Sequence, residues 1–224
     1  MIMKFIAIIV AGGSGSRMGA DIPKQFLYLE NKPILLRSLE KFRAAHRIIL
    51  SIHSDYHDYW NELVRDFPGA PAHFMVAGGR TRYDSVRNAL EAVHDNDAIV
   101  AVHDAVRPLV SEKLITLSFE AAKHHGTAIP VIPVEDTVRE IGDDGSRVID
   151  RSKLFRVQTP QSFELNLLQQ AYKQPYSSDI TDDASLVEKM GKRLHFIEGE
   201  KANIKLTEPD DLEFAKRYLG GAGL

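Results

Sequence analysis

Short apolar runs alternate with longer amphipathic segments along most of this chain. The runs are rich in β-branched residues and predict strands, whereas the segments between them repeat apolar residues every three or four positions and predict helices. The expected strands are Phe5–Val10, Arg47–Ile52, His73–Val76, Ala98–Val102, Thr127–Ile132, Arg193–Ile197 and Asn203–Leu206.

The predicted helices begin at residues that suit a helix start. Proline is favoured in the first turn, and short polar side chains cap the free backbone N–H groups. The expected starts are Pro33, Ser54 or Asp55, Asp84, Ser111, Thr181 and Pro209. Alternation of strand and helix at this spacing predicts a three-layer α/β fold with a mostly parallel, Rossmann-like sheet of the nucleotidyltransferase type. We expect one domain, over residues 1–224.

One stretch breaks this alternation. Two polar strands, Val134–Ile141 and Ser146–Arg151, flank a Gly-Asp-Asp-Gly turn and predict a β-hairpin. An isolated hairpin of this length is marginally stable in water, so it needs a packing partner. We therefore expect a protruding β-arm at about residues 134–152 that packs on a second subunit of a homodimer.

A glycine-rich loop follows the first strand. Gly12, Gly13 and Gly15 let backbone N–H groups face an anion, and Arg17 and Lys24 add full positive charge for a triphosphate in an exposed loop. The spacing excludes the Walker A motif and the dinucleotide fingerprint, whose final glycine is replaced by Met18.

Composition narrows the class of protein. Apolar residues make up 44% and charged residues 26%, as in ordinary globular proteins. The net charge of −3 argues against nucleic-acid binding, and the longest apolar run is too short to span a membrane. The chain has no cysteine, which removes disulfides and thiolate chemistry. We expect a cytoplasmic enzyme that binds neither nucleic acid nor membrane.

Four further clusters could carry chemistry, each with a plainer structural alternative. Gly79 and Ser85 lie at a helix start that suits an anion or a base edge, or form a turn and cap. Asp104 follows a predicted strand, where a single carboxylate can hold Mg²⁺ together with phosphates; the plainer alternative is a contact with local backbone. Arg107, three residues later, can neutralise phosphate or simply pair with Asp104. Lys205, on the same side of its predicted strand as Asn203, is aimed at a ligand.

The fourth cluster lies on the predicted arm. Thr137 could donate a hydroxyl and Arg151 could fork onto a phosphomonoester, although residues of a surface hairpin often have no such role.

The order and spacing of these clusters resemble the 2-C-methyl-D-erythritol 4-phosphate cytidylyltransferase family. The resemblance covers nearly all of the chain and is most specific in Arg17-Met18-Gly19…Pro23-Lys24-Gln25-Phe26, Arg82-Tyr83-Asp84-Ser85-Val86, His103-Asp104-Ala105-Val106-Arg107-Pro108, Gln158-Thr159-Pro160-Gln161, Thr181-Asp182-Asp183-Ala184-Ser185 and Asn203-Ile204-Lys205.

The resemblance implies a CTP-using enzyme that transfers CMP to methylerythritol phosphate and releases pyrophosphate, with Mg²⁺ as cofactor and a homodimer as the working unit. It assigns the cytidine to Ala11, Gly12, Gly13, Gly79 and Ser85, and the metal to Asp104. It assigns catalysis to Arg17, Lys24 and Lys205, and the acceptor to Arg107, Thr137, Arg151 and Lys205.

Two alternatives stay open from the sequence. Ribitol 5-phosphate cytidylyltransferases share the loop and the chemistry, but the run from Thr181 to Glu188 resembles the methylerythritol enzymes more closely. A non-catalytic nucleotide-binding module would explain the glycine loop but not the later Asp, Arg and Lys clusters.

Overall fold

The computed structural model of the chain describes residues 3–12, 22–95 and 97–221, and its centre is a mixed sheet of eight strands. These strands are β1 (Lys4–Val10), β4 (Arg47–Ile52), β5 (Phe74–Ala77), β6 (Ala98–Asp104), β7 (Thr127–Pro133), β10 (Phe155–Val157), β11 (Gln161–Glu164) and β12 (Phe196–Glu198). Their order is β10-β7-β11-β6-β1-β4-β5, and β12 pairs with β7 beside this path.

Most of the sheet is parallel, as predicted. β1 pairs in parallel with β4 and β6, β4 pairs in parallel with β5, and β12 pairs in parallel with β7. The exceptions are β11, which lies antiparallel between β6 and β7, and β10, which lies antiparallel to β7. The apolar pattern predicted neither of these strands nor the helix that follows β11, because Gln161–Glu164 is short and half polar.

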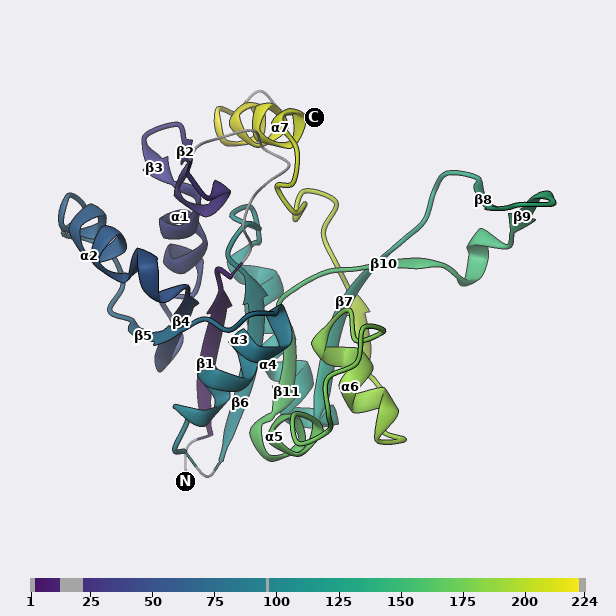
Figure 1. Cartoon of the computed structure of the whole chain (residues 1–224), viewed down its shortest axis with the longest axis horizontal. Coiled ribbons are helices and arrows are strands. Elements are labelled where there is room, and N and C mark those ends of the chain that lie inside the picture. The colour runs from purple at the N-terminus through teal and green to yellow at the C-terminus, as the bar shows by residue number, and fades with distance from the viewer. Residues whose placement is uncertain (1–2, 13–21, 96, 222–224) are drawn as a thin grey trace.

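Helices cover both faces of the sheet (Figure 1). They are α1 (Ile34–Lys41), α2 (His57–Arg65), α3 (Arg82–Glu91), α4 (Glu112–His125), α5 (Leu165–Ala171), α6 (Asp183–Lys189) and α7 (Pro209–Leu219). Across the part of the chain that the structure describes, every helix is too short or too polar to traverse a lipid bilayer.

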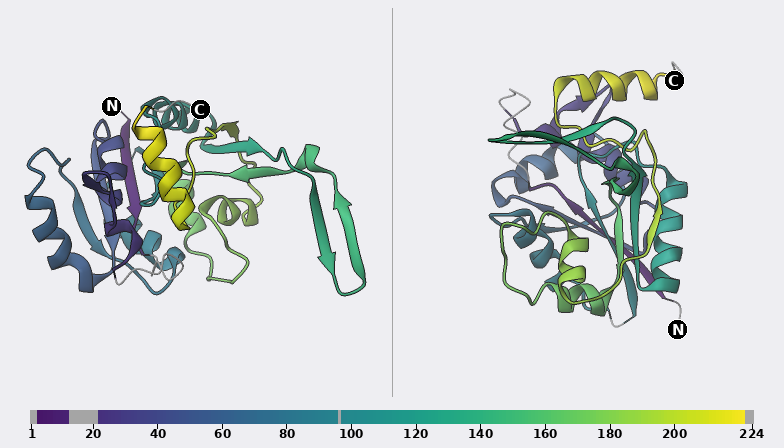
Figure 2. Two further views of the ribbon diagram at one scale, coloured as in Figure 1. Left: turned by 90° about the horizontal axis from the view of Figure 1, so that it is seen from above. Right: turned by 90° about the vertical axis from the view of Figure 1, so that its right-hand side faces the viewer.

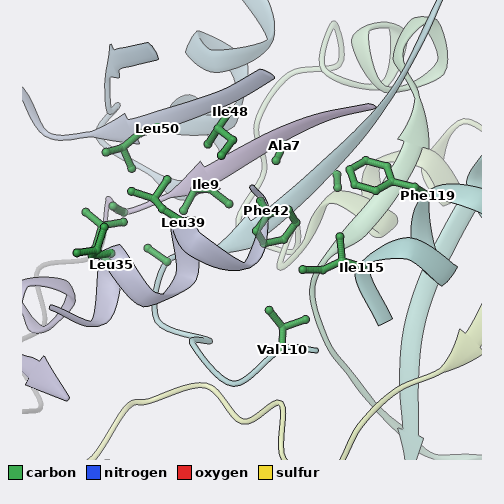
Figure 3. Close-up of a cluster of buried hydrophobic side chains, with 14 of the residues drawn as sticks. Ala7, Ile9, Leu35, Leu39, Phe42, Ile48, Leu50, Val110, Ile115 and Phe119 are labelled. Atoms are coloured by element: carbon green, nitrogen blue, oxygen red, sulfur yellow. The ribbon is translucent and has the colours of Figure 1, made fainter. Parts of the chain in front are cut away.

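The alternation of side chains along β1 creates two buried layers. Ala7 and Ile9 pack with α1, α2 and α4, and Figure 3 shows Leu39 of α1 and Phe42, just after that helix, in this cluster. Ile6 and Ile8 point to the other face and pack with α3, α5 and α6. Because β1 is buried on both faces, it reads as a continuous apolar run, which is typical of a central parallel strand.

A small subdomain lies over the end of the sheet where β1 and β6 finish. It contains the short hairpin of β2 (Tyr28–Leu29) and β3 (Lys32–Pro33), with α7 packed against it. Leu29, Val106 and Leu206 form its buried core, so the last helix is fixed to the loop after β6.

The predicted hairpin is present as a separate two-stranded sheet. Its strands are β8 (Val138–Gly142) and β9 (Gly145–Ile149), shorter than expected and joined at Asp143-Asp144. Gly145 has φ +124°, a conformation that favours glycine. Figures 1 and 2 show the arm extending away from the rest of the chain, and Ile141 at 81% exposure carries an apolar side chain into solvent.

The structure corrects the helix starts expected at Ser54 or Asp55 and at Thr181. The helix expected from Ser54 or Asp55 is preceded by a 3-10 turn over Ser54–Tyr56, and α2 begins at His57. Asp182, not Thr181, caps α6 through its contact with the Ser185 N–H at 3.0 Å.

The expected strand Asn203–Leu206 is an irregular segment. Its backbone groups bond elsewhere: the Ile204 N–H donates to the Ala202 carbonyl, and the Leu206 N–H donates to the Val106 carbonyl. They are therefore not available to a sheet ladder.

Candidate active site

The carboxyl ends of the central strands meet at one edge of the sheet. The Ala11 N–H, just after β1, donates to the Ser51 carbonyl of β4 at 2.8 Å. The Ala105 N–H, just after β6, donates to the Val10 carbonyl at 3.0 Å. This is the edge at which ligands bind in open α/β sheets.

Asp104 is the acidic centre of this edge. Its side chain is nearly buried, and three cationic side chains surround it: Arg82, Arg107 and Lys205, here called the rim cations. One carboxylate oxygen lies 3.4 Å from Arg82 Nε. The other lies 3.4 Å from Arg107 Nε and 3.0 Å from Lys205 Nζ. Arg82 also pairs with Asp183, so three positive charges face two carboxylates. The cluster keeps one net positive charge, which suits a polyphosphate.

The rim cations keep Asp104 ionised. Burial alone would raise the pKa of the Asp104 carboxyl, but Arg82, Lys205 and Arg107 outweigh it and hold that pKa far below its usual value. Burial would likewise lower the pKa of the Arg82 guanidinium, whereas its two carboxylate partners, Asp183 and Asp104, raise it well above the ordinary value. Asp104 and Arg82 are therefore both charged at neutral pH.

Lys205 reaches this cluster from the irregular segment after β12. Arg107 Nη1 donates to the Asn203 carbonyl at 2.8 Å, and Asn203 Nδ2 donates to the Thr159 carbonyl at 2.8 Å. Asn203 is completely buried, whereas the Lys205 side chain is 42% exposed. The two side chains thus differ from the expectation that both face a ligand: Asn203 anchors the segment, and Lys205 is presented at the rim.

His103 supports the rim from inside β6. Its Nε2 lies 3.1 Å from the Arg107 carbonyl, which can only accept, so Nε2 carries the proton. Its Nδ1 lies 3.1 Å from Thr159 Oγ1, which also accepts the Asp104 N–H at 3.1 Å. Burial lowers the pKa of His103 to about 4, so the ring is neutral and acts as a structural link.

The residues expected to hold the cytidine are brought together from three elements. The Gly79 N–H donates to Ser85 Oγ at 3.0 Å, and a Cβ on Gly12 would lie 2.9 Å from the same oxygen. A Cβ on Gly79 would lie 2.1 Å from the Asp84 Cβ, so this position also requires glycine for packing. Ala11 is buried beside Gly12 at the end of β1.

Ala11, the first residue after β1, is tied to the 3-10 turn of Lys24-Gln25-Phe26. Gln25 Nε2 donates to the Ala11 carbonyl at 2.9 Å. Lys24 is 9% exposed, which contradicts the expectation that it stands in an exposed loop. Gly13 and Arg17 lie outside the described residues.

A cavity of about 260 Å³ opens beside Asp104. The rim cations line it, together with several residues of the family motifs to which the sequence assigned no function. The lining residues are Arg82, Asp104, Arg107, Val157, Gln158, Thr159, Gln161, Thr181, Asp182 and Lys205. Arg82 could have been predicted as a site residue, because it is the first residue of α3 and lies between the predicted cytidine contacts Gly79 and Ser85 in the sequence.

Thr137 and Arg151 are not brought to this cavity within one chain. Both are exposed at the base of the arm, just outside its two strands, where Arg151 donates to the Glu135 carbonyl. Both residues were predicted to lie within the hairpin strands. The pairing of β8 with β9 ends at Val138 and Ile149, so Thr137 and Arg151 fall outside the paired stretch.

The donor set fits a divalent cation that arrives with a nucleotide. In the described ranges, no group of three or more His, Cys, Asp or Glu side chains could hold a metal by itself. Asp104 supplies one ionised carboxylate, and Mg²⁺ commonly binds through one or two carboxylates together with substrate phosphates and water.

Comparisons with known proteins agree with this geometry. The family model described as 2-C-methyl-D-erythritol 4-phosphate cytidylyltransferase matches residues 5–221. A protein of that name from Porphyromonas gingivalis is 46% identical over 222 residues, with 98% of this chain and 99% of the relative covered. One from Bacteroides thetaiotaomicron is 44% identical over 220 residues, with 97% and 100% covered.

The fold agrees as well. The crystal structure of the Thermus thermophilus enzyme of that name has a TM-score of 0.79 at 31% identity, with 97% of this chain and 98% of that chain covered. Sequence, fold and the charge cluster at the sheet edge point the same way: this chain belongs to the 2-C-methyl-D-erythritol 4-phosphate cytidylyltransferase family.

Proposed function

We propose that this chain transfers CMP from CTP to 2-C-methyl-D-erythritol 4-phosphate and releases pyrophosphate, the reaction for which its family is named. The observation that carries the proposal is the cluster of rim cations around ionised Asp104, next to the cradle of Gly12, Gly79 and Ser85. Such a site can hold a nucleoside on one side and several phosphates on the other.

The chemistry follows from the charges. An oxygen of the acceptor phosphate forms a bond to the α-phosphorus of CTP, and the bond from that phosphorus to the oxygen shared with the β-phosphate breaks. Pyrophosphate leaves with the electron pair. The attacking oxygen is already anionic, so no general base is required, and catalysis consists of positioning and charge neutralisation.

Each group of residues has a part in this reaction. The cytidine is held by Ala11, Gly12, Gly79 and Ser85. Gly13, which the structure does not describe, would complete this group. Lys24 and Arg17 would face the triphosphate. Lys205 and Arg107 neutralise the charge of the acceptor phosphate, which must approach a second polyanion.

We further propose that Asp104 holds Mg²⁺ in the enzyme with CTP bound. The ion would neutralise and orient phosphate oxygens. The residue's part is to present an ionised carboxylate at the rim, and Arg82, Arg107 and Lys205 keep it ionised.

The arm supports a homodimer. It has exposed apolar side chains at Ile141 and Val148, and Phe155 and Val157 of β10 are exposed as well. Thr137 and Arg151 would then bind the acceptor phosphate in the neighbouring subunit's site, since they do not line the cavity of their own chain.

The substrate is tested by measuring pyrophosphate release with CTP, Mg²⁺ and either methylerythritol phosphate or ribitol 5-phosphate. We expect turnover with the first acceptor at least tenfold faster than with the second. Faster turnover of ribitol 5-phosphate, or CTP binding with no turnover of either acceptor, would overturn the proposal.

The dimer is tested by mixing inactive Arg151→Ala and Lys24→Ala subunits. A mixed dimer has one site with both lesions and one with neither, so activity should partly return after subunit exchange. Exchange without recovery, or a fully active monomer, would refute the contribution of the arm.

A further inference from the structure

The rim cations are not held equally. In the part of the chain that the structure describes, Asp104 is the one charged partner of Lys205, whose side chain is 42% exposed. Arg107 has a second contact, from Nη1 to the Asn203 carbonyl at 2.8 Å. Arg82 has a second carboxylate, because its Nη2 lies 2.6 Å from Asp183 Oδ2. Lys205 is therefore the cation that can leave Asp104 at the lowest cost.

Asp183 is an unusually firm anchor for Arg82. Its side chain is completely buried, it accepts the Tyr172 hydroxyl as well as Arg82, and its backbone N–H donates to Gln161 Oε1 at 3.1 Å. A buried carboxylate left without its cation strongly destabilises a folded protein. The Arg82 guanidinium is thus held by Asp183 as well as by Asp104.

The reaction requires a cation to move. All three rim cations contact Asp104 in this structure, whereas phosphates need cationic partners of their own. When Lys205 turns toward a phosphate, the carboxylate loses its shortest contact, the one at 3.0 Å. A group that does not move with the substrate must then hold Asp104 in place.

We propose that Arg82, anchored by Asp183, is a positioning residue that holds the Asp104 carboxylate while Lys205 turns from Asp104 to the substrate phosphates. The inference rests on the proposed function and adds two residues to it. Arginine is required because its planar fork contacts two carboxylates at once, one through Nε and one through Nη2, whereas lysine carries a single point charge.

The test compares three variants with wild type by steady-state kinetics and thermal unfolding. Arg82→Lys keeps the charge and loses the bridge, so kcat should fall roughly 10- to 100-fold while the KM for CTP changes less than about threefold. Tyr172→Phe removes a hydroxyl from Asp183 but leaves the Arg82–Asp183 pair, so Tm should fall with kcat within about threefold of wild type. Arg87→Lys, on the exposed side of the same helix, is the matched control and should change neither.

A double mutant separates positioning from a purely structural role. If Arg82 acts through Asp104, then Arg82→Lys should slow single-turnover transfer much less in an Asp104→Asn enzyme than in wild type. Equal losses in both backgrounds, or a kcat within threefold of wild type for Arg82→Lys alone, would overturn the proposal.

A crystal structure of Arg82→Lys gives a readout that needs no turnover. The Asp104 carboxylate should leave its present position, and an unchanged position would overturn the proposal. If wild-type enzyme transfers no CMP, the proposed function is wrong, and this structure alone decides whether Arg82 positions Asp104.

Discussion

Replacing Lys205 with methionine should abolish most of the activity and leave the fold nearly unchanged. The methionine side chain keeps most of the apolar stem and removes the charge. Asp104 keeps two cationic partners, Arg82 and Arg107, so its charge stays compensated. Because Lys205 is 42% exposed, its ion pair contributes no more than about 1 kcal/mol to stability. For a chain of this size that is a fall in Tm of about 4 °C at most.

The expected loss of activity is much larger. A charged contact that strengthens as the transition state forms is worth roughly 2.7–4 kcal/mol, or a 10²- to 10³-fold fall in kcat. The assay is pyrophosphate release at saturating CTP and acceptor, with thermal unfolding measured on the same samples. Lys216→Met is the control, since Lys216 pairs with Glu213 on the surface of α7 at 2.7 Å.

Two results would refute this reasoning. A kcat within tenfold of wild type would show that Lys205 does not act on the transition state. A Tm fall well beyond that of the control would show that Lys205 mainly stabilises the folded rim.

Three further predictions concern the same site. Lys24→Ala and Arg17→Ala should each lower kcat by about 10²-fold or more. Lys24 is buried, so Lys24→Ala should also lower stability, as circular dichroism melts would show. Activity should vanish in EDTA and return with Mg²⁺, and Asp104→Asn should need more Mg²⁺ for half-maximal rate; full activity in EDTA would contradict this. His103 has its pKa lowered to about 4 by burial, so an unfolded chain binds its proton first as pH falls. The stability it contributes above pH ~6.5 should be lost between pH ~6.5 and ~4, by about 3 kcal/mol in urea unfolding, and His103→Gln should flatten that slope.

The sequence predicted the frame of the molecule because burial leaves a simple pattern. β1 is apolar on both faces, which is typical of a central strand. The glycines that follow it fit neither a helix nor a strand, so they predict a loop. Asp104 and Lys205 were found because charged residues interrupt apolar stretches. The predicted strand at 203–206 was wrong because periodicity does not reveal that Arg107 takes the Asn203 carbonyl.

The role of Arg82 was also beyond the sequence. It depends on Asp183, which lies 101 positions later and meets Arg82 only because α6 packs beside α3 against the same face of the sheet. β11 was missed for a related reason. Gln161–Glu164 forms a strand because it pairs with both β6 and β7, whereas its own residues show no clear strand pattern.

The irregular segment that carries Lys205 also affects the order in which the enzyme is made. Lys205 comes after every strand of the main sheet, and its segment is fixed by the Leu206–Val106 contact and by α7, which follows it. Domains can begin to fold while the ribosome is still adding residues. The full set of cations around Asp104 can therefore form only after the last part of the chain has been added and α7 has packed against the rest of the subdomain.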